Sequence, residues 1–175
     1  QQEADMDIKA TLNNLLIPYT SNYAGTLLPG IREYTVTPGE KTTTISGKGK
    51  AGLKQEENYY FFYLPVCYKG ITGKSYAYYN TSRSKNLYLP ASVDENYSYD
   101  IQLPENLTLC TPIQEKKIDN PIGSFKITLT SEGSSLHIEL ALQIKKQLIT
   151  PAEYPAFRSL ITEWTDRTRK PILFK

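Results

Sequence analysis

Three side chains in this sequence are candidates for nucleophilic catalysis: Cys67, Cys110 and His137. A cysteine nucleophile needs a thiolate, a base that takes its proton, and a third group that orients the base. His137 is the only histidine, and its neighbours Leu136 and Ile138 alternate with it along a predicted strand, so we expect the imidazole on the polar face of an exposed hairpin. Neither cysteine begins a predicted helix, where the helix dipole would lower the pKa of a thiol. The sequence therefore favours buried thiols and a surface histidine over a catalytic pair.

Other patterns that could carry chemistry are also incomplete. One histidine and two distant cysteines do not make a metal site, so we expect no metal and no cofactor. The adjacent carboxylates Asp94 and Glu95 are expected on an exposed turn, where they would be solvated rather than catalytic. Residues 47–52 (GKGKAG) resemble a phosphate-binding loop only superficially, since the spacing is wrong and no helix is expected to follow; a loop or a bulged strand is predicted instead. No catalytic residue is predicted, and a disulfide between the two cysteines stays open.

Aromatic side chains are the remaining chemical feature. Residues 58–65 read NYYFFYLP, and successive side chains of a strand point to opposite faces, so both faces of this strand are aromatic and something must cover each of them. Residues 76–80 read YAYYN and are the best candidate for an exposed aromatic patch that stacks on sugar rings, with strand packing as the alternative. In 58–65 we expect Tyr59, Phe61 and Tyr63 in the core, with the alternate set Tyr60, Phe62 and Leu64 as the other possibility. The candidate interaction surface therefore consists of Tyr60, Phe62, Tyr76, Tyr78 and Tyr79.

Length and charge narrow the class of protein. A chain of 175 residues suits one medium domain or two small ones and is long enough to bury a core. With 20 basic and 18 acidic residues, the net charge of +2 gives no reason to expect nucleic acid as a partner. No apolar run approaches the ~20 residues of a membrane span, and residues 1–7 do not resemble a signal peptide. Because the chain begins with Gln, we expect a processed protein or an excised piece of a longer one.

The elements that must position these residues are mostly strands. Turn residues and prolines fall between the alternating segments, and residues 131–134 (SEGS) predict a hairpin turn. Many short strands with regular turn signals predict an all-β, mainly antiparallel, immunoglobulin-like β-sandwich. Alternation of apolar and polar residues predicts the clearest strands at 6–12, 31–37, 41–46, 97–103, 125–129 and 136–142.

In the C-terminal part of the chain, the spacing of the apolar residues changes from that of a strand to that of a helix. Residues 154–168 predict one amphipathic helix, because Tyr154, Phe157, Leu160, Ile161 and Trp164 recur at helical spacing on one face. Trp164 is therefore expected to be largely buried. The helix needs an apolar surface to lie on, and we expect it on the outer face of a sheet, where it would cover the outward aromatic residues of the 58–65 strand.

Several of these segments, taken in order, resemble a known family. From residue 57 to residue 175 the chain is similar to the β domain that follows the transglutaminase-like core in large periplasmic or surface proteins of Bacteroidetes. The resemblance implies that the catalytic Cys, His and Asp lie in a preceding core, and no position of this chain matches them. The segments that carry it are 59–65 (YYFFYLP), 68–73, 83–90 (ending in LYLP), 94–106 (DENYSYDIQLPEN), 120–125 (NPIGSF), 150–164 (TPAEYPAFRSLITEW) and 172–175 (ILFK).

Two functions remain open. The first is a non-catalytic accessory domain at residues 57–175, preceded by a β segment at 1–56 whose membership of the same sandwich is undecided. Its partner would be the adjacent transglutaminase-like domain or another protein or peptide. The second is an independent module that binds carbohydrate or a surface polymer through exposed tyrosines. The resemblance implies a periplasmic, cell-surface or secreted location.

Overall fold

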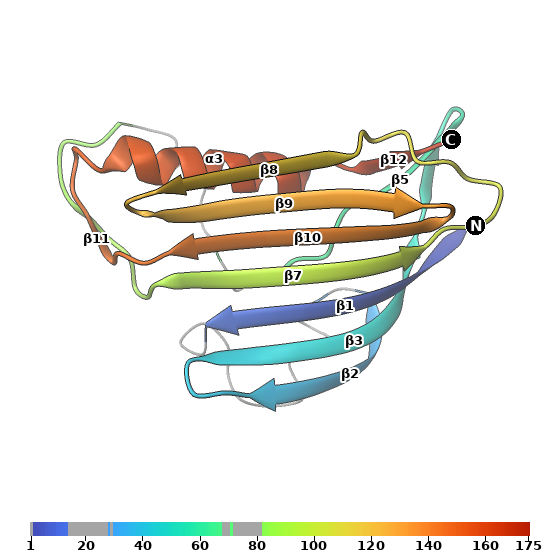
Figure 1. Cartoon of the computed structure of the whole chain (residues 1–175), viewed down its shortest axis with the longest axis horizontal. Helices are drawn as coiled ribbons and strands as arrows, with labels where there is room; N and C mark the ends of the chain where they lie inside the picture. Colours follow the sequence, from blue (N-terminus) through green and yellow to red (C-terminus); the bar gives the residue numbers. More distant parts are fainter. Residues whose placement is uncertain (1, 14–27, 29, 68–70, 72–81) are drawn as a thin grey trace.

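The computed structural model describes residues 2–13, 28, 30–67, 71 and 82–175, and its core is one large antiparallel sheet (Figure 1). The predicted all-β sandwich with a C-terminal helix is confirmed. Seven strands form the large sheet, in the order β2 (Ile31–Pro38), β3 (Thr42–Gly52), β1 (Glu3–Asn13), β7 (Val93–Gln102), β10 (Ser135–Ile144), β9 (Gly123–Glu132) and β8 (Gln114–Asn120).

The second layer lies on one face of this sheet and is made of several smaller pieces. Its helix, α3 (Tyr154–Arg169), lies beside a three-stranded sheet. One hydrophobic core joins both of them to the large sheet. The small sheets contain β12 (Ile172–Phe174), β5 (Tyr59–Phe62) and β4 (Lys54–Glu56) in one, and β11 (Leu148–Ile149) and β6 (Leu87–Tyr88) in the other.

Alternation along the central strands explains why only one face of the large sheet is covered. In β1 and β7, every second residue is buried and the residues between them are polar. The register then aligns the buried positions, so that Ile8 faces Tyr99 on β7, and Tyr99 in turn faces Ile138 on β10. Opposed side chains in antiparallel strands share a face, so these residues build one apolar surface on the inner side. The outer side is left polar and solvated.

The leading segment of the chain supplies β1, β2 and β3 to the large sheet. β1 lies between β3 and β7, so it joins the first strands directly to the later ones. Residues 47–52 are part of β3 rather than a loop, and the only register shift along this hairpin lies in β2, between Ile31 and Glu33. Gly49 allows this close pairing, because a Cβ atom there would lie 2.2 Å from the carbonyl oxygen of Gly30. The glycine-rich sequence therefore has a packing role.

α3 buries the predicted apolar stripe, with Trp164, Phe157 and Leu160 each 0% exposed. The expected burial of Trp164 is confirmed. The expected place of the helix is wrong, because α3 packs on β9 and β10 at the inner face of the large sheet. The physical reason is that the apolar face of the large sheet is larger than the small sheet can cover. The short strands β12, β5 and β4 cover only one end of it (Figure 1), and the helix covers another part. Lys116 on β8 also forms an ion pair with Glu163 on α3.

Candidate functional site

The aromatic strand β5 faces the opposite way from the sequence prediction. Phe62 is 4% exposed and Tyr60 is half-buried, whereas Tyr59 and Tyr63 are 41% and 47% exposed. The reason is its partner β12, because Phe62 lies opposite Ile172 and stacks on Phe174 with 5.7 Å between ring centroids. The assignment of Phe62 to an exposed surface is therefore wrong, and Tyr60 is only partly exposed. Among the described residues, the helix α3 packs on β9 and β10 rather than on the outward set.

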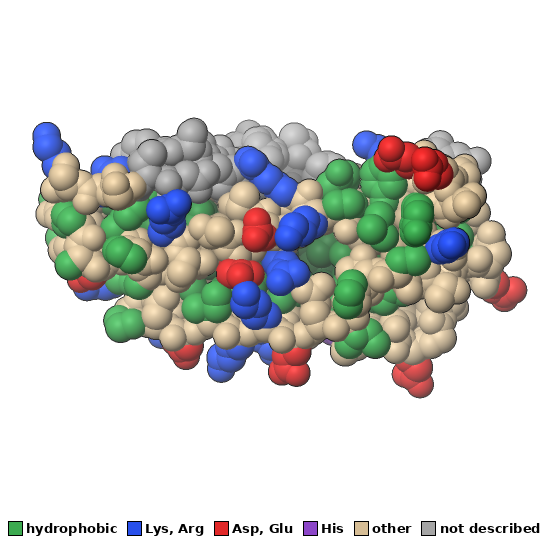
Figure 2. All heavy atoms as spheres, turned by 90° about the horizontal axis from the view of Figure 1, so that it is seen from above, with side chains coloured by type: hydrophobic (Ala, Val, Ile, Leu, Met, Phe, Trp, Pro, Cys, Tyr) green, Lys and Arg blue, Asp and Glu red, His purple; other side chains and the backbone are tan. Residues whose placement is uncertain are grey.

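The outward side of the three-stranded sheet carries a cluster that we call the aromatic face: Tyr59, Phe61, Tyr63, Leu173 and Cys110. Pairing places Leu173 opposite Phe61, and Cys110 donates its backbone N–H to the carbonyl of Leu173 at 2.8 Å. The rings of Phe61 and Tyr63 meet edge to face at 6.2 Å. Figure 2 shows hydrophobic side chains gathered at the end of the molecule that carries β12 and β5. The aromatic face is a candidate for a contact with another protein surface.

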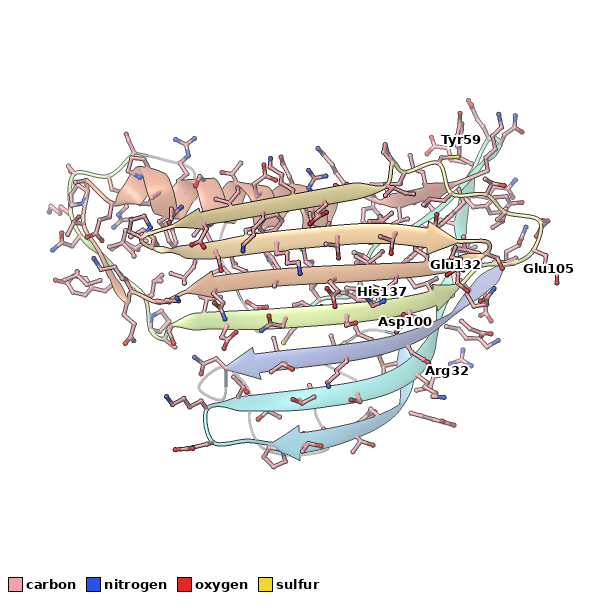
Figure 3. The ribbon with its side chains drawn as sticks, in the orientation of Figure 1. Arg32, Tyr59, Asp100, Glu105, Glu132 and His137 are labelled. Carbon is pink, nitrogen blue, oxygen red and sulfur yellow. The ribbon has the colours of Figure 1, made fainter. Side chains whose placement is uncertain are left out.

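Charged side chains surround this cluster. The ammonium group of Lys175 lies 5.7 Å from the centre of the Tyr59 ring, a cation–π distance. Lys54 and Glu56 on β4 lie opposite Phe61 and Tyr59. Figure 3 labels Tyr59 at the same end of the molecule as the C-terminus. An apolar centre with a charged border is the usual anatomy of a protein–protein contact.

The other predicted aromatic residues, Tyr76, Tyr78 and Tyr79, lie outside the described residues. Their exposure, and with it a sugar-stacking platform at 76–80, stays a prediction.

His137 forms a pair that the sequence did not reveal. Its Nδ1 atom lies 2.7 Å from Oδ1 of Asp100, which is opposite it on the neighbouring strand β7 (Figure 3). This hydrogen bond raises the pKa of His137 above its ordinary value, and the charges of Asp100 and Glu139 raise it further. The pair lines a hollow of about 480 Å³ on the outer face of the large sheet, together with Asp5 and Asp7. Only the register of β7 and β10 brings the two side chains together.

The Asp100–His137 pair does not complete a nucleophilic site in the part of the chain that the structure describes. Nε2 of His137 faces Glu139 at 3.6 Å, so both ring nitrogens are directed at carboxylates. Such surroundings favour the imidazolium ion, which cannot accept a proton from a nucleophile. The hydroxyl group of Ser135 donates to Gln102 at 2.8 Å instead.

Neither cysteine lines the hollow that holds this pair. Cys67 is buried in the hydrophobic core, and Cys110 is an exposed thiol on the aromatic face, with no disulfide between them. The prediction of buried thiols therefore holds for one of the two. Among residues 2–13, 28, 30–67, 71 and 82–175, no three histidine, cysteine or carboxylate side chains gather as metal ligands.

Glu95 is the second group that sequence reasoning misplaced. It is fully buried on β7 rather than solvated on a turn. Its Oε2 atom accepts the backbone N–H of Ile71 at 2.6 Å, and its Oε1 atom accepts the hydroxyl of Tyr97 at 2.8 Å. Burial raises the pKa of Glu95 to about 7, although both hydrogen bonds act in the opposite direction. The sequence did indicate this burial, because Glu95 lies two and four residues before the inward residues Tyr97 and Tyr99, and every second residue of a strand points to the same face.

These polar groups of β7 fasten the segment that follows β5 to the large sheet. The backbone N–H of Cys67 donates to the Tyr97 hydroxyl at 3.0 Å, and the Tyr99 hydroxyl donates to the carbonyl of Pro65 at 2.6 Å. Burial raises the pKa of both tyrosines well above the ordinary value. Every polar atom in this chain of contacts has a partner, as a buried network requires. The network is therefore best understood as structural.

Comparison with known proteins adds a family and one solved relative. Residues 58–174 match the model of a domain of unknown function with solved structure (DUF3858). A crystal structure described as a "putative protease" from Parabacteroides distasonis is similar, with 31% sequence identity and a TM-score of 0.59. The match covers 68% of this chain and 24% of that chain, so this chain corresponds to a minor part of the longer protein. The curated proteins contain no match.

Proposed function

This chain belongs to the DUF3858 family of domains of unknown function, and from that premise we propose that it is a non-catalytic accessory domain of a larger protein. The observation that carries the proposal is the surroundings of His137, whose two ring nitrogens both face carboxylates. A general base needs a nitrogen directed at the nucleophile. The chain instead offers an aromatic face suited to a protein contact.

The larger protein is proposed to be transglutaminase-like. The order of the motifs between residues 57 and 175 supports this link, since it resembles the β domain that follows such a core. The similar crystal structure is described as a "putative protease", and the match covers 24% of its chain. Catalysis in the part of that protein outside the match is compatible with the proposal. The same resemblance supports a periplasmic, cell-surface or secreted location. Among the described residues, no helix is long and apolar enough to cross a bilayer.

The isolated chain of 175 residues is expected to hydrolyse no peptide, ester or amide and to crosslink no amines. The measurement is turnover of fluorogenic substrates of each class, compared with buffer alone. Cys67→Ala and His137→Ala serve as matched variants and are expected to give the same background rate. A measurable activity that either substitution removes would contradict the proposal, because that residue would then belong to a catalytic site.

The gene product that contains this chain provides the positive test of the accessory role. Residues outside 1–175 are expected to hold a catalytic Cys, His and Asp, and substituting that cysteine is expected to abolish protease or amine-crosslinking activity. In the same full-length protein, His137→Ala is expected to change kcat by less than about twofold, since it removes no contact with the transition state. A gene product without any catalytic part outside 1–175 would refute the proposal.

A further inference from the structure

We propose that the aromatic face docks the part of the longer protein that is joined to this chain ahead of β1. The inference rests on the proposed function and adds to it the surface of contact. Its occupant is the preceding catalytic part of the same polypeptide, rather than a second copy of the chain or a free ligand. Two features of the structure lead to this surface: exposed apolar side chains in one cluster, and the position of the two chain ends.

The first feature is the clustering. Elsewhere in the described chain, Tyr88 on β6 is 72% exposed and lies opposite Leu148 on β11, which is 41% exposed, so these two side chains form a small pair at the other end of the molecule (Figure 1). Isolated apolar residues and small pairs are normal on a soluble surface. Tyr59 and Tyr63 instead share a face with Phe61 and Leu173, and the last two are only half-buried. Contiguous apolar surface of this kind marks a site of contact.

The second feature is the position of the chain ends. The carbonyl of Gln2 accepts the backbone N–H of Leu53 at 3.0 Å, immediately before β4 begins at Lys54. A domain joined ahead of β1 therefore emerges beside the edge strand of the small sheet. Figure 1 shows the start of β1 and the C-terminus at the same end of the molecule. A tethered domain has a high effective concentration over a nearby surface, and a modest apolar contact is then enough to hold it.

Cys110 gives a native reporter of this contact. Its thiol is exposed and lies on the aromatic face, whereas the other cysteine, Cys67, is buried and reports only unfolding. The rate at which iodoacetamide alkylates each cysteine is measured by mass spectrometry in the chain of 175 residues and in the full-length gene product. Alkylation of Cys110 is expected to be about tenfold slower or more in the full-length protein, because a face docked nine-tenths of the time leaves the thiol open for one-tenth.

Two substitutions in the full-length protein test the face itself. Tyr63→Asp puts a charge on the aromatic face and is expected to restore the alkylation rate of Cys110 to that of the isolated chain. Tyr88→Asp is the matched control, an exposed tyrosine at β6, and is expected to leave Cys110 protected. A third variant, Thr130→Cys in a Cys110→Ser background, reports on the outer face of the large sheet, where Thr130 is exposed on β9 opposite His137. It is expected to react equally in both proteins.

The outcomes separate this inference from the proposed function. Equal alkylation of Cys110 in both proteins would overturn the docking face, while a catalytic part outside 1–175 would still support an accessory role. Protection of Thr130→Cys instead of Cys110 would place the contact on the outer face of the large sheet and would also overturn the inference. A gene product without a catalytic part would overturn both. Slow alkylation of Cys110 that Tyr63→Asp restores, and Tyr88→Asp does not, supports the proposal.

Discussion

Replacing Trp164 with alanine is expected to lower the free energy of unfolding of this chain by about 3–5 kcal/mol. The indole ring is 0% exposed on α3, and its centroid lies 5.9 Å from the ring of Tyr97 on the large sheet. Removing it leaves a cavity at the contact between the helix and the sheet, which neighbouring side chains fill only in part. The same side chain supports Tyr97, so the buried network around Glu95 is expected to loosen as well.

The measurement is urea denaturation followed by circular dichroism, with the midpoint and slope fitted separately. Thr162→Ala, at an exposed position of the same helix, is the control and is expected to change stability by less than about 0.5 kcal/mol. A loss below about 1 kcal/mol for Trp164→Ala would contradict tight packing of α3. It would suggest that the stripe of the helix serves a partner instead.

The stability of the chain is expected to fall as pH rises from 4.5 to about 7, through the titration of Glu95. The folded-state pKa of about 7 exceeds the ordinary value of 4.5, so the folded protein binds more protons than the unfolded chain in this range. The contribution is fully present below pH 4.5 and is lost as pH passes through 7. Burial is the physical cause, since it penalises the ionised carboxylate, and the loss is on the order of 3 kcal/mol.

Glu95→Gln isolates this contribution from the other carboxylates, because the amide does not titrate. The unfolding free energies of both proteins are measured from pH 4 to pH 9, and the difference between them is expected to change over the range 4.5 to 7 and to be constant above it. Faster exchange of the Ile71 amide hydrogen at pH 8 than at pH 5, corrected for the intrinsic pH dependence of exchange, would locate the effect at the buried carboxylate of Glu95, because opening this segment to water relieves the burial of the ionised form. Parallel curves for the two proteins would refute the assignment.

Local sequence patterns were sufficient to predict those features that depend on one helix or strand alone. Alternation of apolar and polar residues correctly predicted six of the strands, including β7, β9 and β10, although several of them are longer in the structure than predicted. The strand β8 was missed because QEKKIDN lacks alternation. Among the described strands it lies at the edge of the sheet and pairs with β9 alone, and charged side chains are common on edge strands. The family match at residues 58–174 omits β1, β2 and β3, which the large sheet includes.

By itself the sequence determined the all-β class, the C-terminal helix and the buried stripe around Trp164, because periodicity within one segment encodes which residues share a face. The tertiary structure alone decided which face of β5 points inward, since both faces are aromatic and only the contact of Phe62 with Phe174 distinguishes them. It also decided the pairing of Asp100 with His137. These two residues are far apart in the chain, and the register that opposes them is fixed by the packing of whole strands.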